Sequence, residues 1–229
     1  MELNERQRQI LDILKRQKKV SVKSLSETLY ASQMTIRRDL TNLSSSGLLT
    51  RYHGGAVVKE DDTQQPINVR HFIDDGEKKL LAQQAVRYLS DDMLVFIDCS
   101  STCSYIIPYL KNFSKIRVVT NSVHVLLLLA DAHIPCSVAG GYYYEPEMCM
   151  IGRETEEFLS KINPDVAFFS FLGISRDGRI TDNNEAITSV RRSVIKNAAK
   201  VVCLLDSAKL NCLYTYTVCT TKDVDVIIT

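Results

Sequence analysis

From residue 78 onward, short apolar runs alternate with stretches that have helical periodicity. Six runs have the length and β-rich composition of buried strands, at residues 93–98, 116–120, 134–139, 165–171, 201–206 and 224–228. Strands that alternate with helical segments are typical of α/β domains, in which the strands form a largely parallel sheet. The sequence therefore predicts an α/β domain over residues 78–229, with a Rossmann-like arrangement of strands and helices.

The composition agrees with a folded protein and argues against disordered, fibrous and membrane classes. Apolar residues make up 45% of the 229 residues and charged residues 24%. The N-terminal residues are polar, unlike a secretory signal. The longest apolar run, at residues 123–130, is far shorter than the roughly 20 residues that cross a bilayer. We expect a cytoplasmic protein with no membrane partner.

The cysteines point to a reducing compartment rather than to a metal site. The seven are Cys99, Cys103, Cys136, Cys149, Cys203, Cys212 and Cys219. Their number is odd, and they form no Cys-x-x-Cys pair and no Cys/His group at zinc spacing. Free thiols are expected, with no metal and no cofactor.

Ahead of the α/β domain, the spacing of apolar residues predicts three short helices. The first covers residues 4–17. The second follows Ser21, a good N-cap residue, and ends near Tyr30. Three closely spaced short helices are typical of helix-turn-helix domains, although the same geometry also serves in protein–protein contacts.

The third helix presents a polar side to solvent. Its N-cap candidate is Ser32, and its apolar stripe consists of Ile36, Leu40 and Leu43. At about 100° per residue, the opposite side carries Met34, Arg38, Thr41 and Ser45, with Thr35 and Arg37 on the flanks. Arginine and small polar side chains on such a helix can reach base edges in the major groove of DNA. We interpret this segment as a recognition helix.

A hairpin follows the third helix. Gly47 ends the helix, and residues 48–58 are predicted to form two short strands around a His-Gly-Gly turn. Arg51 and His53 lie near the tip of this wing, where cationic side chains can contact phosphates or the minor groove. Residues 1–58 are therefore predicted to form a winged helix-turn-helix domain.

The charge distribution separates this domain from the remainder of the chain. Ten Lys and Arg against five acids give residues 1–58 a net charge of +5, whereas 18 against 22 give the remainder −4. A basic module on a mildly acidic chain indicates a polyanion-binding domain, and a solvated charged surface is the alternative. Residues 59–77 are polar and non-periodic, and we interpret them as a linker.

The third helix and its surroundings resemble a known family. The matching segments are Ser32-Gln33-Met34-Thr35-Ile36-Arg37-Arg38-Asp39-Leu40, Arg6-Gln7-Arg8-Gln9-Ile10-Leu11 and Gly54-Gly55-Ala56. They resemble the signature of the DeoR family of bacterial transcription regulators. The resemblance implies double-stranded operator DNA as a partner, contacted by Ser32, Gln33, Thr35, Arg37 and Arg38. It also implies a structural role for Asp39, which we expect to brace an arginine.

Polar residues follow successive strands of the predicted sheet. Asp98-Cys99-Ser100-Ser101-Thr102 follows the first strand, Thr120-Asn121-Ser122 the second and Gly140-Gly141 the third. The carboxyl ends of parallel strands are the usual place for ligands, because loops there lead into helix N-termini with free N–H groups. Together the loops favour a pocket for a phosphate or carboxylate, whereas singly each is equally well explained as an N-cap.

The order of these loops resembles the sensor domain of the same family, which is similar in fold to sugar-phosphate isomerases. The match also includes the segments 177–182 and 205–209. By this resemblance, the effector is a phosphorylated sugar, and the candidate pocket residues are Asp98, Ser100, Ser101, Thr102, Asn121, Gly141, Gly173, Glu185 and Lys209. Hydroxyl and N–H groups and Lys209 would hold the phosphate, and Asp98 or Glu185 would accept bonds from sugar hydroxyls.

The chain departs from the family pattern at three positions. Ser100 stands where many members have glycine, and Phe171 and Leu172 stand where members commonly have Ala-Asp. Phe171 and Leu172 either pack in the core or alter the pocket, in which case the effector need not be a sugar phosphate. Members usually continue past the apolar run that ends at Thr229, so a truncated C-terminus is one interpretation.

The leading hypothesis is a sequence-specific transcriptional regulator, most simply a repressor of carbohydrate genes, that forms a homodimer or homotetramer and has no catalytic residues. The alternative is an isomerase-like enzyme that uses Asp98, Glu185 or Lys209 as acid or base, joined to a DNA-binding or protein-interaction module. The absence of a carboxylate at Leu172 weakens this alternative.

Overall fold

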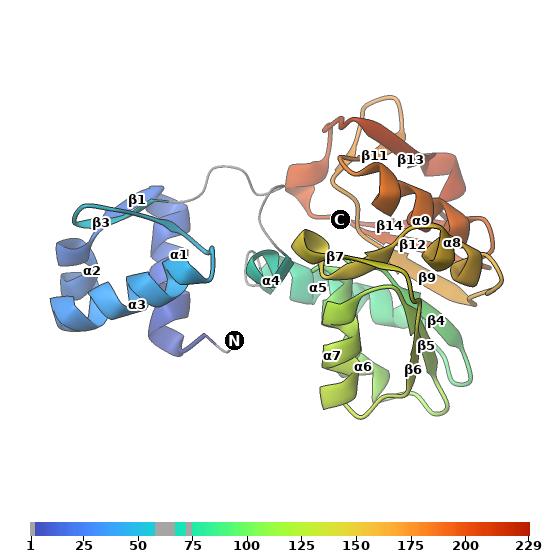
Figure 1. Ribbon diagram of the computed structural model, residues 1–229, viewed down its shortest axis with the longest axis horizontal. Coiled ribbons are helices and arrows are strands. Elements are labelled where there is room, and N and C mark those ends of the chain that lie inside the picture. Colours follow the sequence, from blue (N-terminus) through green and yellow to red (C-terminus); the bar gives the residue numbers. More distant parts are fainter. Residues whose placement is uncertain (1–2, 58–66, 72–74) are drawn as a thin grey trace. The chain divides into compact units, whose positions relative to one another are not determined.

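The structure is a computed structural model that describes residues 3–57, 67–71 and 75–229. The chain divides into two compact units, Met1–Arg70 and His71–Thr229 (Figure 1). The two units are described separately below.

The N-terminal unit is a winged helix-turn-helix, as predicted. Its elements are α1 (Glu5–Gln17), β1 (Lys19–Ser21), α2 (Val22–Thr28), α3 (Gln33–Ser45), β2 (Thr50–Tyr52), β3 (Gly55–Val57) and α4 (Ile67–Arg70). The strands form an antiparallel sheet in the order β1-β3-β2. Strand β1 was not predicted, because its three residues form a strand only through pairing with β3, where Val20 lies opposite Ala56.

Side-chain caps begin α1, α2 and α3. Asn4 Oδ1 accepts a bond from the Gln7 backbone N–H, and Gln7 Oε1 accepts one from the Asn4 backbone N–H, which forms a capping box. Ser21 and Ser32 each accept a bond from the backbone N–H three residues later. The predicted apolar stripe of α3 is confirmed, since Ile36, Leu40 and Leu43 are fully buried.

The C-terminal unit is built on one six-stranded sheet, and all six predicted runs are its strands. These are β4 (Leu94–Ile97), β5 (Arg117–Thr120), β6 (Cys136–Val138), β9 (Val166–Phe169), β12 (Val201–Leu204) and β14 (Val226–Ile228). Their order is β14-β12-β9-β4-β5-β6, and every neighbouring pair is parallel. The predicted α/β class is confirmed.

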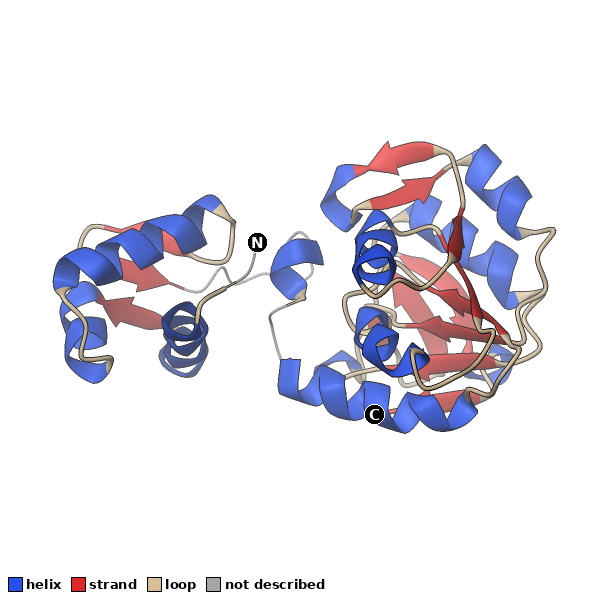
Figure 2. Cartoon of the chain, turned by 90° about the horizontal axis from the view of Figure 1, so that it is seen from below, coloured by secondary structure: helices blue, strands red, loops and turns tan. Residues whose placement is uncertain are grey.

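Helices cover both faces of this sheet (Figure 2). The helices are α5 (Asp75–Ala85), α6 (Ile107–Leu110), α7 (Val123–Asp131), α8 (Arg153–Leu159) and α9 (Glu185–Ile195). Leu81 of α5 and Leu129 of α7 pack with Ile97 and Phe168 on one face. Residues of α8 and α9 pack with Phe96, Phe169 and Cys203 on the other. The alternation of strand side chains produces these two cores.

Two smaller sheets were not predicted. A three-stranded antiparallel sheet contains β10 (Gly173–Ile174), β11 (Arg179–Asp182) and β13 (Tyr216–Thr220), and a hairpin contains β7 (Tyr142–Tyr144) and β8 (Cys149–Ile151). Turns of 3-10 helix occur at Val86–Tyr88, Cys103–Ile106, Glu145–Glu147, Ser207–Lys209 and Thr221–Asp223. All seven cysteines are free, as expected.

The predicted linker at residues 59–77 lies largely outside the described residues. Two described parts of it are helical, namely α4 and the first three residues of α5. The sequence placed the start of α5 too late, because its first turn carries Asp75, Gly76 and Glu77 and shows no apolar periodicity. The domain boundaries therefore stay a proposal.

Candidate functional site

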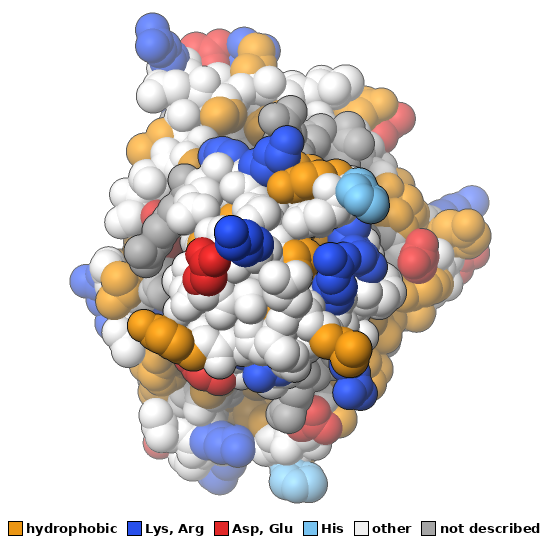
Figure 3. Space-filling view, turned by 90° about the vertical axis from the view of Figure 1, so that its left-hand side faces the viewer, with side chains coloured by type: hydrophobic (Ala, Val, Ile, Leu, Met, Phe, Trp, Pro, Cys, Tyr) orange, Lys and Arg blue, Asp and Glu red, His pale blue; other side chains and the backbone are white. Residues whose placement is uncertain are grey.

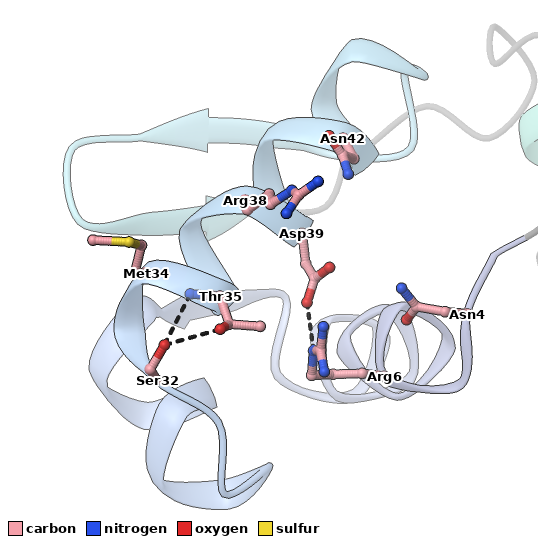
Figure 4. Close-up of a pocket in the computed structure, with 8 residues that line it drawn as sticks. All are labelled: Asn4, Arg6, Ser32, Met34, Thr35, Arg38, Asp39 and Asn42. Carbon is pink, nitrogen blue, oxygen red and sulfur yellow. Dashed lines mark hydrogen bonds and ion pairs between the residues drawn. The ribbon is translucent and has the colours of Figure 1, made fainter.

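The exposed side of α3 carries the predicted DNA-contacting residues. Gln33, Arg37 and Arg38 are exposed, and the Met34 side chain, which lies one turn before Arg38, is 81% exposed. Residues of α3 and of the start of α1 line a shallow hollow, in which Arg38 lies between Met34 and Asn42 (Figure 4). Figure 3 shows one face of the molecule, on which Lys and Arg side chains lie among apolar, acidic and uncharged side chains.

Ser32 and Thr35 form the N-terminal cap of α3. Ser32 Oγ accepts a bond from the Thr35 backbone N–H at 3.2 Å, and the two hydroxyl groups lie 2.9 Å apart (Figure 4). Both hydroxyls are therefore engaged locally, which fixes the start of the helix.

Asp39 braces an arginine, as predicted, and the structure identifies the partner as Arg6. The Arg6 Nε donates to Asp39 Oδ2 at 2.5 Å, which joins α1 to α3 (Figure 4). The Asp39 side chain is buried and that of Arg6 is partly exposed. The hydrogen bond to Asp39 raises the pKa of Arg6. The sequence alone did not show which arginine Asp39 contacts.

The wing is attached to the recognition helix. Arg51 Nη1 donates to Thr41 Oγ1 at 2.7 Å, and Thr41 Oγ1 donates to the Arg37 carbonyl at 2.8 Å. His53 is exposed in the turn of the hairpin. The sequence placed both residues near the tip of the wing. In the structure His53 lies in the turn at the tip, whereas Arg51 lies against α3.

In the C-terminal unit, the strand ends bring several predicted residues together. The pairing of Ile97 with Thr120 puts Asn121 beside Asp98 at the carboxyl ends of β4 and β5. Lys209 donates to Ser170 Oγ at 3.3 Å and pairs with Asp206 at 2.9 Å. The loops after β4, β5, β9 and β12 therefore meet at one edge of the sheet.

Asp98 is held by a buried arginine that the sequence analysis missed. Arg191 donates from Nε to Asp98 Oδ1 at 3.2 Å and from Nη2 to Oδ2 at 2.8 Å. It also contacts Asp182 Oδ2 and the Ser170 carbonyl. Burial alone lowers the pKa of Arg191, but Asp98 and Asp182 outweigh it and hold this pKa above its ordinary value. Both oxygens of Asp98 thus accept bonds from Arg191, and the contact of Asp98 with sugar hydroxyls stays a prediction.

The loop after β4 is buried and polar. Ser100 Oγ accepts a bond from the Cys103 backbone N–H at 3.1 Å, and Ser101 Oγ accepts one from Lys78 Nζ at 3.2 Å. Lys78 is only 6% exposed, and it is a second residue that the sequence analysis missed. Within the described part of the chain, Thr102 Oγ1 and Asn121 Oδ1 are buried without a hydrogen-bond partner. Such atoms need a ligand or water to satisfy them.

The remaining predicted pocket residues differ in environment. Gly141 adopts a φ of +144°, and a Cβ there would lie 2.7 Å from the Ile151 carbonyl oxygen, so this position requires glycine. Gly173 is packed against the Cys212 backbone. Glu185 is exposed in the first turn of α9. Among the described residues, no hydrogen bond or ion pair joins Gly141, Gly173 or Glu185 to the buried loop after β4.

Phe171 packs in the core, which agrees with the first interpretation for this residue, whereas Leu172 is half-buried. Its side chain is 1% exposed and stacks on Phe169 with ring centroids 5.7 Å apart. The guanidinium of Arg191 lies 5.2 Å from its ring centroid.

Two further observations concern metals and membranes. Among the described residues, no three His, Cys, Asp or Glu side chains lie close enough together to hold a metal ion. None of the described helices has the length and apolar composition needed to cross a membrane.

Comparison with known proteins identifies both units. Residues 6–62 match the DeoR-like helix-turn-helix domain, and residues 74–229 match the DeoR C terminal sensor domain. The chain is 30% identical to the HTH-type transcriptional regulator GolR of Listeria innocua, over 98% of this chain and 89% of that protein. It is 29% identical to the glycerol-3-phosphate regulon repressor of Escherichia coli (91% and 83%) and 33% identical to the L-fucose operon activator of Haemophilus influenzae (90% and 84%).

A solved D-ribose-5-phosphate isomerase is 21% identical, with a TM-score of 0.46, over 59% of this chain and 54% of that one. The two family matches together extend across both units of the chain. The chain belongs to the DeoR family of transcription regulators.

Proposed function

We propose that this regulator represses genes of carbohydrate metabolism from a double-stranded operator and that a phosphorylated sugar controls its binding. The observation that carries the effector proposal is the buried loop after β4, where Lys78 contacts Ser101 and Thr102 Oγ1 has no partner among the described residues. A buried ammonium group next to hydroxyl groups is suited to an anion. Ser100 and Ser101 would supply hydroxyls, and Asn121 Oδ1 would accept a bond from a sugar hydroxyl.

Lys209 is the second cation of the proposed pocket. It lies at the carboxyl end of β12 and already pairs with Asp206 and contacts Ser170. A phosphate that displaced Asp206 would gain a charge-assisted bond. Gly141 and Gly173 would contribute only backbone to the pocket, because both are packed closely against neighbouring residues. Glu185 would lie at the rim, because its side chain is exposed.

For DNA, we propose that Gln33, Arg37 and Arg38 contact base edges and that Ser32, Thr35, Arg51 and His53 contact the backbone. The exposed guanidinium of Arg38 is suited to bidentate contact with guanine. Ser32 at the helix start and Arg51 across α3 are suited to phosphates. The regulator would act in the cytoplasm, where chromosomal DNA and phosphorylated sugars are present together.

The enzymatic alternative needs a carboxylate that is available to move protons beside the substrate. Both oxygens of Asp98 accept bonds from Arg191. Glu185 is exposed. These placements support binding of a sugar phosphate without its conversion. Incubation with pentose and hexose phosphates, followed by product analysis, tests the enzymatic alternative.

Calorimetric titration with a panel of triose, pentose and hexose phosphates tests the effector proposal, with the unphosphorylated sugars as controls. We expect at least one phosphorylated compound to bind and to weaken DNA binding in a gel-shift assay. Lys78→Met should reduce that affinity at least about tenfold, since a charge-assisted bond is worth about 1.5–3 kcal/mol. Lys79→Met is the matched control, because Lys79 is exposed on the same helix. Equal binding of phosphorylated and unphosphorylated sugars would reject the proposal.

We also propose a homodimer or homotetramer assembled through the α/β domain. Winged-helix proteins generally pair on repeated half-sites, and symmetric oligomers provide that pairing. Sedimentation of the full chain measures the assembly, and a monomer that still protects two half-sites would contradict it.

A further inference from the structure

Met34 is an apolar side chain in an unusual place. It is 81% exposed on α3, although methionine is among the residue types that are most often buried. The helix does not need it for its own core, which Ile36, Leu40 and Leu43 supply. Its exposure on α3 leaves the side chain available for contact with a partner.

The residues around Met34 include those proposed above to contact DNA. Met34 lines the same hollow as Arg38 and Asn42, and its thioether extends outward beside the helix start (Figure 4). The hydroxyls of Ser32 and Thr35 next to it are bonded to each other. Met34 thus contributes the large apolar group of this surface, while Arg38 contributes the charge.

The major groove offers one apolar group at the base edges, the 5-methyl group of thymine. Met34 and Arg38 are four residues apart, which is about 6 Å along a helix. Base pairs are about 3.4 Å apart. The two side chains can therefore reach base pairs about two steps apart or less in one groove.

We propose that Met34 is a specificity-determining residue that selects a thymine by contact with its 5-methyl group, within about two base pairs of the position that Arg38 contacts. Burial of one methyl-sized group corresponds to a change in affinity of about three- to fivefold. The contact discriminates thymine from cytosine and from uracil at one position of each half-site. A soft, flexible thioether suits this role, since it can adapt to the methyl group without a fixed donor geometry.

The test replaces each thymine of the bound operator, one at a time, by deoxyuridine, which removes only the methyl group. We expect the wild-type chain to lose about three- to fivefold in affinity at one thymine per half-site. Met34→Ala should bind the thymine and uracil forms of that site equally well. Met34→Leu should keep most of the difference, because leucine is also apolar.

Leu213→Ala is the matched control, because Leu213 is exposed in the other unit and its loss should leave the thymine preference unchanged. Three results would overturn the proposal: no thymine at which the wild-type chain senses the methyl group, an undiminished difference in Met34→Ala, or a Met34→Ala variant that loses oligomerisation instead. Because Met34 is exposed, its replacement should leave the N-terminal unit folded, and thermal melting of each Met34 variant checks this.

Discussion

Arg191 joins segments that are far apart in the sequence. Its guanidinium contacts Asp98 after β4, Asp182 at the end of β11 and the carbonyl of Ser170 after β9. The side chains of all three ionised residues are almost completely buried. A cation in such a place holds the loops at the strand ends in one arrangement, which is a requirement for a preformed pocket.

Arg191→Leu should lower the free energy of unfolding by about 3–5 kcal/mol, because it leaves two buried carboxylates without their cation. Urea denaturation of the C-terminal transition measures the loss. Arg176→Leu, at an exposed position, is the control and should change stability by less than about 0.5 kcal/mol. A loss of similar size in both variants would contradict the role assigned to Arg191.

Individual partners were the least predictable part of the site. The sequence predicted that Asp39 braces an arginine, but only the fold shows that this is Arg6, 33 residues away. Arg191 interrupts the buried side of α9 between Ile187 and Val194, and this was a signal that could have been found. Lys78 gave no such signal, because a lysine at the start of a helix is usually solvated.

At the scale of elements, strands with continuous apolar runs were predictable and short paired strands were not. All six runs became strands of the parallel sheet, because a strand buried on both faces is apolar throughout. Strand β10 has two residues, and the pairing of β11 with β13 shifts between Ile180 and Thr181. Such strands depend on long-range pairing rather than on local pattern.

The turn into β7 provides an element-scale prediction. Gly141→Ala should destabilise the C-terminal unit by about 1–3 kcal/mol, since alanine rarely adopts this backbone conformation and its Cβ would meet the Ile151 carbonyl. Gly140→Ala is the matched control, as a Cβ there meets nothing within 4 Å. Thermal unfolding compares the two variants, and equal melting temperatures would show that the β7–β8 hairpin tolerates a side chain at residue 141.

At the scale of the whole molecule, two partly buried histidines make stability depend on pH. The ring of His71 stacks on Tyr105 and lies 5.0 Å from the ring of His124. Burial, with a contribution from His124, lowers the pKa of His71 to about 4, and burial lowers that of His124 as well. Between about pH 6.5 and pH 4 the unfolded chain therefore binds protons that the folded chain does not.

The contribution of the two histidines to stability is therefore fully present above pH 6.5 and is lost as the pH falls toward 4. We expect the free energy of unfolding of the C-terminal unit to drop by about 1–2 kcal/mol between pH 7 and pH 5. His71→Phe should flatten this dependence, whereas replacement of the exposed His133 by Asn should not. If His71→Phe kept the full pH dependence, groups other than His71 would be responsible for the loss of stability at low pH.

The two units also differ in charge, and this difference bears on how the chain meets DNA. Residues 1–58 carry ten Lys and Arg against five acids, a net charge of +5 within an overall charge of +1. Concentration of positive charge in the unit that holds α3 favours association with a polyanion by that end of the chain. Binding should therefore weaken steeply as salt is added, because phosphate contacts release counterions.

Selection from a pool of random duplex DNA at low ionic strength, carried out with the full chain, tests the role of α3 most directly. The account predicts enrichment of one family of sequences, bound with a steep salt dependence, and a loss of about 1–3 kcal/mol in affinity for Arg38→Ala with relaxed preference at one base pair. No enrichment by a chain whose N-terminal unit is folded, or an Arg38→Ala variant with unchanged affinity and preference, would contradict it.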